Sequence, residues 1–208
     1  MVFNLPRIYP ITDTSISGLS HSEQIERLAA GGATLIQMRE KRASPREFYR
    51  MALDAMTIAT KLGVQIIVND RVDIAVAVDA DGVHLGQDDL PPERARVLLG
   101  KSRIIGFSTH SLEQAIAADS APIDYIAIGP IFNTASKEKP DPAVGAIAIS
   151  AIKPQLTKPL VAIGGITLDT VSEVIAAGAD SVAIISDLLT AKDITQRTRT
   201  YFEMGVGN

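Results

Sequence analysis

The feature that most constrains the fold of this chain is an eightfold alternation of short β-branched runs with amphipathic segments. Each run is followed by a polar or glycine-containing loop and then by a stretch with helical spacing. Several of these stretches end at a glycine, the residue that commonly stops a helix. Some runs are apolar at consecutive positions, which is typical of strands in a parallel sheet covered on both faces. The runs predicted as strands start at Arg7, Thr34, Gln65, Gly82, Arg103, Tyr125, Leu160 and Ser181.

Eight such units in 208 residues leave about 26 residues for each strand, helix and pair of loops. Eight consecutive strand–helix units close naturally into a (β/α)8 TIM barrel. The competing architecture is an open doubly wound sheet, but no glycine fingerprint opens the first helix and nothing breaks the repeat. We therefore predict an α/β fold in which residues 1–208 form a single (β/α)8 barrel domain.

The composition narrows the classes of function. The chain has no cysteine, which excludes thiolate nucleophiles, zinc–thiolate sites and iron–sulfur clusters. A net charge of −4, the lack of a basic block and 4% aromatic residues argue against a nucleic-acid partner. The first residues do not resemble a leader peptide, and no apolar run reaches the roughly 20 residues that span a bilayer. We therefore expect a cytoplasmic protein without a membrane partner.

Unusual polar residues gather at the carboxyl ends of the predicted strands or in the loops that follow. In a barrel these ends meet at one rim, where catalytic residues lie in this fold. General loop polarity does not explain Gln37 and Arg39, which alternate at the end of an otherwise apolar strand. The polar residues at the predicted rim are Asp13, Gln37, Arg39, Lys41, Asn69, Asp70, Arg71, Gln87, Asp88, Asp89, Ser108, His110, Thr134, Ser136, Lys137 and Ser186.

The last two predicted strands end in features suited to phosphate. Gly164 and Gly165 close the seventh strand, and Ile185 with Ser186 closes the eighth, each ahead of a predicted helix. Glycines let a phosphate approach backbone N–H groups, and a helix N-terminus adds positive potential. This is also where phosphate sites recur in such barrels.

Asp70 and Asp89 end neighbouring strands and supply oxygen ligands alone, the kind that Mg²⁺ prefers. With Arg39 and Lys41 beside them, they predict a magnesium and pyrophosphate site. The alternative is that one aspartate caps a helix and the other is solvated. Lys137, in the segment TASKEKPDP, is either a third cation of this site or an exposed surface lysine.

The three histidines offer no clear general base. His21 is expected to be exposed near a helix start, and His84 to be a core or rim histidine within its strand. His110 is expected near the site. Without a paired serine and aspartate, acyl-transfer hydrolysis has no support.

Eight stretches of the chain, in sequence order, carry a family resemblance: YPITD, IQMREK, NDRVDIA, DGVHLGQDD, GFSTHS, DYIAIGPIFNTASK, VAIGGI and AGADSVAIIS. Together they resemble the thiamine phosphate synthase family. The resemblance implies a (β/α)8 barrel that joins a hydroxymethylpyrimidine pyrophosphate to a thiazole phosphate and releases pyrophosphate with Mg²⁺.

The resemblance also implies roles for single residues. The pyrimidine pyrophosphate site would contain Gln37, Arg39, Lys41, Asn69, Ser108 and Lys137, with Arg39, Ser108 and Lys137 as catalytic residues. Asp70 and Asp89 would be the Mg²⁺ ligands. The thiazole phosphate site would contain Thr134, Ser136, Gly165, Ile185 and Ser186. Two features depart from the family: Ser136 replaces a more usual threonine, and EKPDP follows Lys137.

These residues suit a dissociative displacement, in which pyrophosphate leaves first and the thiazole nitrogen captures the pyrimidine carbocation. Such a reaction needs charge compensation and positioning rather than a strong base. One alternative is the thiazole tautomerase branch, which relies on a histidine where this chain has Pro130. The others are a non-catalytic phosphate-binding barrel and a sugar-phosphate isomerase or epimerase. Whether the chain forms a homodimer stays open.

Overall fold

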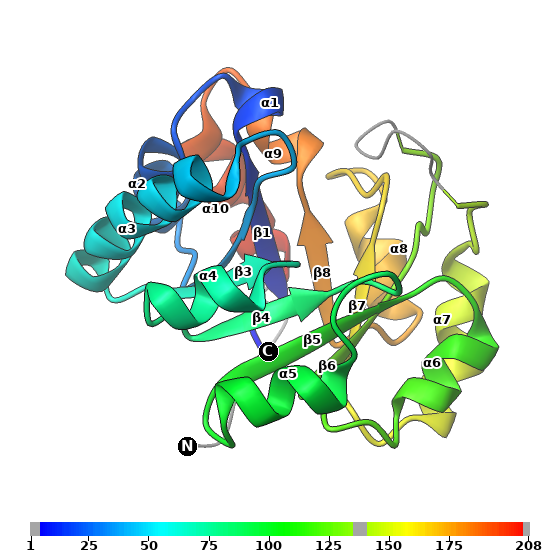
Figure 1. Ribbon diagram of the computed structural model, residues 1–208. Coiled ribbons are helices and arrows are strands. Elements are labelled where there is room, and N and C mark those ends of the chain that lie inside the picture. The colour runs from blue at the N-terminus through cyan, green and yellow to red at the C-terminus, as the bar shows by residue number, and fades with distance from the viewer. Residues whose placement is uncertain (1–4, 135–140, 206–208) are drawn as a thin grey trace.

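The eight predicted strands form one closed barrel of parallel strands. The computed structural model describes residues 5–134 and 141–205, and the strands follow one another around the barrel in sequence order. The first strand pairs with the last, which closes the sheet, and helices surround it (Figure 1). The prediction of a (β/α)8 barrel is confirmed.

Each predicted run contains one strand. Parallel pairing puts the carboxyl ends of all eight at the same end of the barrel, so the residues that follow them become neighbours. Asp13 pairs with Arg39, and Asn69 pairs with His84. The strands are β1 (Ile8–Asp13), β2 (Leu35–Arg39), β3 (Gln65–Asn69), β4 (Gly82–Leu85), β5 (Ile104–Thr109), β6 (Tyr125–Ile128), β7 (Leu160–Ile163) and β8 (Ser181–Ile184).

The helices start where the sequence supplies caps. Ser20 and Ser44 each accept a hydrogen bond from a glutamate amide three residues later, and that glutamate bonds back to the serine amide. No helix in the described part of the chain is both long and apolar enough to cross a membrane. The helices are α1 (Thr14–Ser17), α2 (His21–Ala30), α3 (Pro45–Leu62), α4 (Val72–Ala77), α5 (Pro92–Leu99), α6 (Leu112–Ala118), α7 (Ala146–Ile152), η1 (Lys153–Gln155), α8 (Val171–Ala176), α9 (Ser186–Leu189) and α10 (Ile194–Gly205).

Two separate hydrophobic layers result from the alternation of side chains along each strand. One face of every strand packs against the helices and forms the larger layer, which includes Ile36, Val83 and Ile126. The other face fills the interior of the barrel, with Tyr9, Ile67 and Tyr125 among its buried residues. Polar residues at inward positions near the carboxyl ends therefore point into the mouth of the barrel.

The expectation that His21 is exposed is wrong. His21 is 1% exposed, because the first turn of α2 packs back onto β1 and its ring contacts the Thr12 hydroxyl at 2.8 Å from Nδ1. Burial lowers the pKa of His21, although the carboxylate of Glu40, 3.6 Å away, opposes this shift. A residue in the first turn of a helix can therefore be buried when that turn packs against a strand.

Candidate active site

The open carboxyl end of the barrel holds a cavity of about 510 Å³, with lining residues from all eight strands or the loops after them. Every predicted site residue that the structure describes lines this cavity. They are Gln37, Arg39, Lys41, Asn69, Asp70, Asp89, Ser108, Thr134, Gly165, Ile185 and Ser186. Ser136 and Lys137 lie outside the described residues.

Arg39 is oriented by Asp13, its partner across the β1–β2 ladder. The guanidinium donates to one carboxylate oxygen of Asp13, while the other oxygen accepts from the Ser15 amide and hydroxyl at 2.9 and 2.6 Å. Asp13 is therefore both the N-cap of α1 and the counter-charge of Arg39. Because both side chains are largely buried, this pair fixes a cation at the cavity wall.

Lys41, Asp70 and Asp89 form a second charged cluster beside Arg39. The Lys41 ammonium pairs with Asp70, and the Asp89 carboxylate accepts from the Gly86 amide at 2.7 Å. Burial raises the pKa of the Asp89 carboxyl, and the negative charge of Asp70 raises it further. Asp70 itself has a φ of 63°, in the left-handed region that side chains other than glycine seldom adopt. This backbone turns its carboxylate toward the cluster.

The two carboxylates fit a magnesium ion better than a metal that needs a full set of protein ligands. No group of three or more histidine, cysteine, aspartate or glutamate side chains that could hold a metal occurs in residues 5–134 and 141–205. Mg²⁺ is usually held by one or two carboxylates together with water and substrate phosphates. Asp70 and Asp89 are the donors of this kind that sequence analysis predicted.

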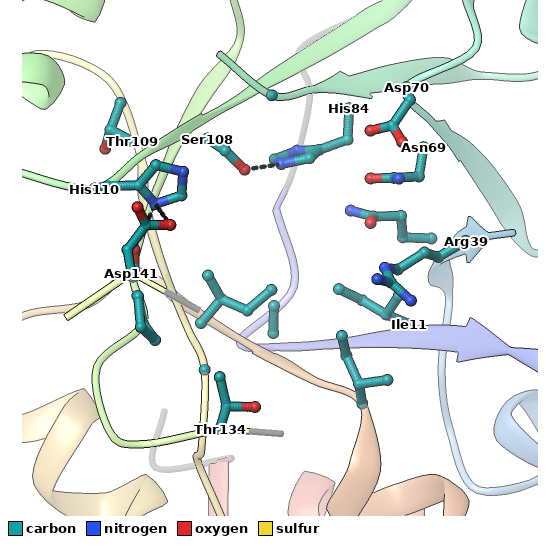
Figure 2. Close-up of a pocket in the computed structure, with 18 of the residues that line it drawn as sticks. Ile11, Arg39, Asn69, Asp70, His84, Ser108, Thr109, His110, Thr134 and Asp141 are labelled. Carbon is teal, nitrogen blue, oxygen red and sulfur yellow. Dashed lines mark hydrogen bonds and ion pairs between the residues drawn. The ribbon is translucent and has the colours of Figure 1, made fainter. Parts of the chain in front are cut away.

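Below the charged groups, five polar side chains form a buried chain of hydrogen bonds. Gln37 Nε2 donates to the Tyr9 hydroxyl at 3.3 Å, and the Tyr9 and Tyr125 hydroxyls are 3.0 Å apart. The Tyr125 hydroxyl lies 2.9 Å from His84 Nδ1. The other ring nitrogen of His84, Nε2, lies 2.8 Å from the Ser108 hydroxyl (Figure 2). We call these five residues the floor relay.

Gly106 makes the centre of the floor relay possible. It pairs with His84 and Tyr125 on the two neighbouring strands. A Cβ at this position would lie 2.5 Å from His84 Nδ1 and closer still to the Tyr125 ring. Its absence lets the two rings stack with their centroids 5.5 Å apart.

His84 is neutral at physiological pH. Burial lowers the pKa of His84 to about 4, and the two ring nitrogens are both in hydrogen bonds within the barrel. The prediction that His84 is a core or rim histidine is confirmed, since it is 6% exposed and lines the cavity. The roles of Tyr9 and Tyr125 were missed, because a tyrosine in a buried strand is usually read as core; their inward positions, shared with Gln37, were the available signal.

The opposite wall of the cavity carries His110 and Asp141 (Figure 2). His110 Nδ1 contacts the Gly129 carbonyl oxygen at 2.7 Å and lies 3.6 Å from the Asp141 carboxylate. The expectation that His110 lies near the site is confirmed. Asp141 was not predicted, because it follows β6 by thirteen residues and no periodic pattern marks it.

The predicted phosphate end has a different backbone arrangement from the one expected. Gly164 and Gly165 have φ values of 102° and 66°, and a Cβ at Gly165 would lie 2.5 Å from the Asn133 carbonyl oxygen. These glycines are therefore required by the close approach of the loop after β6. No helix starts directly behind them, since α8 begins at Val171. At the end of β8 the expectation is met, because α9 begins at Ser186.

Comparisons with known proteins agree with this geometry. A family model described as thiamine monophosphate synthase matches residues 8–188. The thiamine-phosphate synthase of Koribacter versatilis is 46% identical over 207 residues, covering 96% of each chain. That of Chlorobium phaeobacteroides is 48% identical over 178 residues, 86% of each chain. A solved thiamine phosphate pyrophosphorylase from Pyrococcus furiosus is 36% identical, covers 97% of each chain and has a TM-score of 0.86. The chain belongs to the thiamine monophosphate synthase family.

Proposed function

We propose that this chain is a magnesium-dependent thiamine-phosphate synthase. It condenses 4-amino-2-methyl-5-hydroxymethylpyrimidine pyrophosphate with 4-methyl-5-hydroxyethylthiazole phosphate, giving thiamine phosphate and pyrophosphate. The observation that carries the proposal is one cavity with two ends that each suit an anion. Arg39 and Lys41 lie with the carboxylate pair at one end, and the Gly165 turn and the start of α9 lie at the other.

The charged end suits a leaving pyrophosphate. Arg39 and Lys41 supply two cations, and Arg39 is held at the cavity wall by the largely buried Asp13. Asp70 and Asp89 would hold Mg²⁺. A bound Mg²⁺ would offset the negative charge that develops on the departing pyrophosphate. Preorganised charge of this kind lowers the barrier to leaving without any proton transfer. Lys137 is proposed as a further cation here.

The other end suits the thiazole phosphate. Thr134 offers a hydroxyl, and Gly165 lines the same cavity in the turn that follows β7. Ser186 opens the short helix α9, whose first N–H groups have no acceptor within the helix. A short helix after β8 is a recurrent phosphate-binding element of these barrels. Ile185 and Ser136 complete the proposed set.

Part of the cavity wall is apolar, and this supports a dissociative displacement. Ile11, Ile163 and Ala183 line the same cavity as the charged cluster and the phosphate end. Apolar walls keep water from a carbocation until the thiazole nitrogen reaches the reacting carbon. A pKa lowered to about 4 by burial makes His84 a weak base, which fits a reaction that depends on holding two substrates face to face.

The test is product formation from the two purified substrates with Mg²⁺ and with EDTA. We expect thiamine phosphate to form with Mg²⁺ and not with EDTA. We expect the rate of product formation to fall by about 100-fold or more in the Asp70→Asn and Asp89→Asn variants. Asp88→Asn is the matched control, since Asp88 lines the same cavity without a proposed metal role. A folded protein that binds both phosphates but forms no product with Mg²⁺ would overturn the proposal in favour of an isomerase or a phosphate-binding barrel.

A further inference from the structure

We propose that Glu40 is a positioning residue for the charged end of the cavity. Its buried carboxylate holds the backbone that carries Arg39 and Lys41, and it thereby sets the affinity of this end for pyrophosphate. Both cations line the cavity, whereas Glu40 does not, so Glu40 acts on a ligand only through them. The identity of the pyrophosphate as a substrate group rests on the proposed function, but the positioning of the two cations does not.

Glu40 follows Arg39 directly at the end of β2 and lies on the opposite face of the strand. Successive side chains of a strand point to opposite faces, so Arg39 points into the cavity and Glu40 points toward the surrounding helices. The Glu40 side chain is 4% exposed, although it is a carboxylate. A buried charge needs polar partners to offset the loss of water. The partners of Glu40 therefore show what this side chain holds in place.

One carboxylate oxygen of Glu40 closes the turn that carries Lys41. Glu40 Oε1 accepts from the Arg42 amide at 2.8 Å and from the Ala43 amide at 3.2 Å. Lys41 lies inside this turn, and its side chain is half-exposed. The backbone of the turn therefore largely decides which part of the cavity the Lys41 ammonium can reach.

The other carboxylate oxygen joins this turn to the connection between β1 and α1. Glu40 Oε2 accepts from the Thr14 hydroxyl at 2.6 Å. Thr14 directly follows Asp13, which is the partner of Arg39 in the β1–β2 ladder and pairs with its guanidinium. The ends of the two strands are thus joined twice, by Asp13 with Arg39 on the cavity side and by Thr14 with Glu40 on the helix side. A shift of either strand end would disturb both pairs together.

The surroundings of Glu40 also keep it ionised. Burial raises the pKa of the Glu40 carboxyl, but the hydrogen bonds from Thr14, Arg42 and Ala43 together lower it by more, so the pKa lies below its ordinary value. The His21 ring lies beside the same carboxylate, with Nε2 3.6 Å from Oε2. A hydrogen bond to an ionised acceptor is stronger than one to a neutral acceptor. Glu40 is therefore a firm anchor for both connections.

The first test measures the charged end without any chemistry, by calorimetric titration of inorganic pyrophosphate with Mg²⁺ into the folded protein. We expect Glu40→Met to weaken pyrophosphate binding by about tenfold or more. Thr14→Val removes only the bond between the two strand ends, and we expect it to weaken binding by about threefold. Unchanged affinity in Thr14→Val, or in folded Glu40→Met, would overturn the proposal.

Glu47→Met is the matched control. Glu47 accepts from the amide and the hydroxyl of Ser44 at the start of α3, so it anchors a backbone turn as Glu40 does, but on the protein surface. We expect its pyrophosphate affinity to match that of the wild type. A loss equal to that in Glu40→Met would mean that any weakening of this connection lowers the affinity, and Glu40 would then have no special role.

Glu40→Gln separates position from charge. Its amide oxygen can still accept from the Arg42 and Ala43 amides, so we expect it to recover part of the affinity that Glu40→Met loses. If Glu40→Gln binds pyrophosphate as weakly as Glu40→Met, the charge of Glu40 sets the affinity rather than its hold on the turn, and the proposal is wrong.

The second test compares the two substrates in the reaction. We expect Glu40→Met to raise KM for the pyrimidine pyrophosphate by about tenfold and KM for the thiazole phosphate by less than about twofold. The reason is that the proposed thiazole phosphate end follows β7 and β8 rather than β1 and β2. Equal rises in both KM values would indicate a general structural defect and would contradict the proposal. If the proposed function fails, the wild type forms no product, and the pyrophosphate titrations still decide the role of Glu40.

Discussion

The charged end and the floor relay belong to the same cavity but differ in charge and in burial. At the charged end, Arg39, Lys41 and Asp70 are ionised groups that face one another and remain partly open to solvent. In the floor relay, Tyr9, Tyr125 and His84 are neutral, buried and joined in one chain. The charged end is built from residues at or just after the carboxyl ends of β2 and β3, whereas the floor-relay tyrosines lie deeper in the barrel, near the beginnings of β1 and β6.

The difference teaches how each region can act on a ligand. Charge pairs at a half-open site can exchange partners, so under the proposed function Lys41 would leave Asp70 for a phosphate once a metal neutralised the carboxylate. Neutral groups in a dry interior cannot exchange partners without leaving a donor or acceptor unpaired. The charged end is thus suited to bind and release, and the floor relay is suited to hold one fixed orientation.

The largest effect is expected from Arg39→Ala. It removes a cation proposed to stabilise the leaving group and leaves the Asp13 carboxylate buried without its partner. We expect kcat/KM to fall by about 10²–10³-fold and the free energy of unfolding by about 2–3 kcal/mol. Steady-state kinetics and urea unfolding measure the two losses separately.

Two controls separate the roles of Arg39. Arg71→Ala removes an exposed ion pair with Asp73 and should cost less than about 1 kcal/mol. A double variant, Arg39→Met with Asp13→Asn, removes both charges and should regain stability without regaining activity. Recovery of activity in the double variant would show that Arg39 does not act on the substrate.

The second effect is a pH dependence of the stability of the fold, which arises from His84 in the floor relay. The pKa of His84 is about 4 in the folded protein against a usual value near 6.5, so the unfolded chain binds the proton more readily between these values. The fold therefore loses stability as pH falls from about 6.5 to 4, by about 3 kcal/mol for this group.

Urea unfolding across this pH range measures the loss, with His84→Gln as the variant that removes it. Burial also lowers the pKa of His21, so a smaller loss of the same sign should persist in His84→Gln. An identical pH slope in wild type and His84→Gln would show that His84 is not held neutral by the fold.

The third effect tests whether the floor relay depends on its packing. Gly106→Ala places a methyl group against His84 Nδ1 and the Tyr125 ring, and we expect a loss of about 2 kcal/mol from overpacking. Gly63→Ala is the control, since Gly63 has a φ of 68° and nothing within 4 Å of the added Cβ. It should cost about 1 kcal/mol through backbone strain alone. Equal losses of stability in the two variants would mean that the His84 and Tyr125 rings can shift to accommodate the added methyl group at little cost.

The sequence predicted the charged end far better than the floor relay. Arg39, Asp70 and Asp89 could be found because charged side chains at the ends of apolar runs stand out, and Gln37 because it alternates with Arg39 along one strand. Tyr9 and Tyr125 were harder to find, because an aromatic ring in a buried strand has the same pattern whether its hydroxyl is used or not, and only their inward positions marked them. Their role depends on the register that brings β1, β4, β5 and β6 together around Gly106, and a single sequence does not give this register.

The smallest effect is expected from Ser15→Ala, which tests how firmly the charged end is held. Ser15 donates from its hydroxyl to the Asp13 oxygen that does not pair with Arg39, at 2.6 Å. Without this bond Asp13 keeps the Ser15 amide and the guanidinium, so we expect a loss of about 1 kcal/mol in stability and about a threefold rise in KM for the pyrimidine pyrophosphate, with kcat unchanged. Ser17→Ala is the control, since its hydroxyl bonds to the Asp13 carbonyl rather than the carboxylate. A fall in kcat as large as that in Arg39→Ala would show that the charged end is as rigid as the floor relay and does not tolerate the loss of one supporting hydrogen bond.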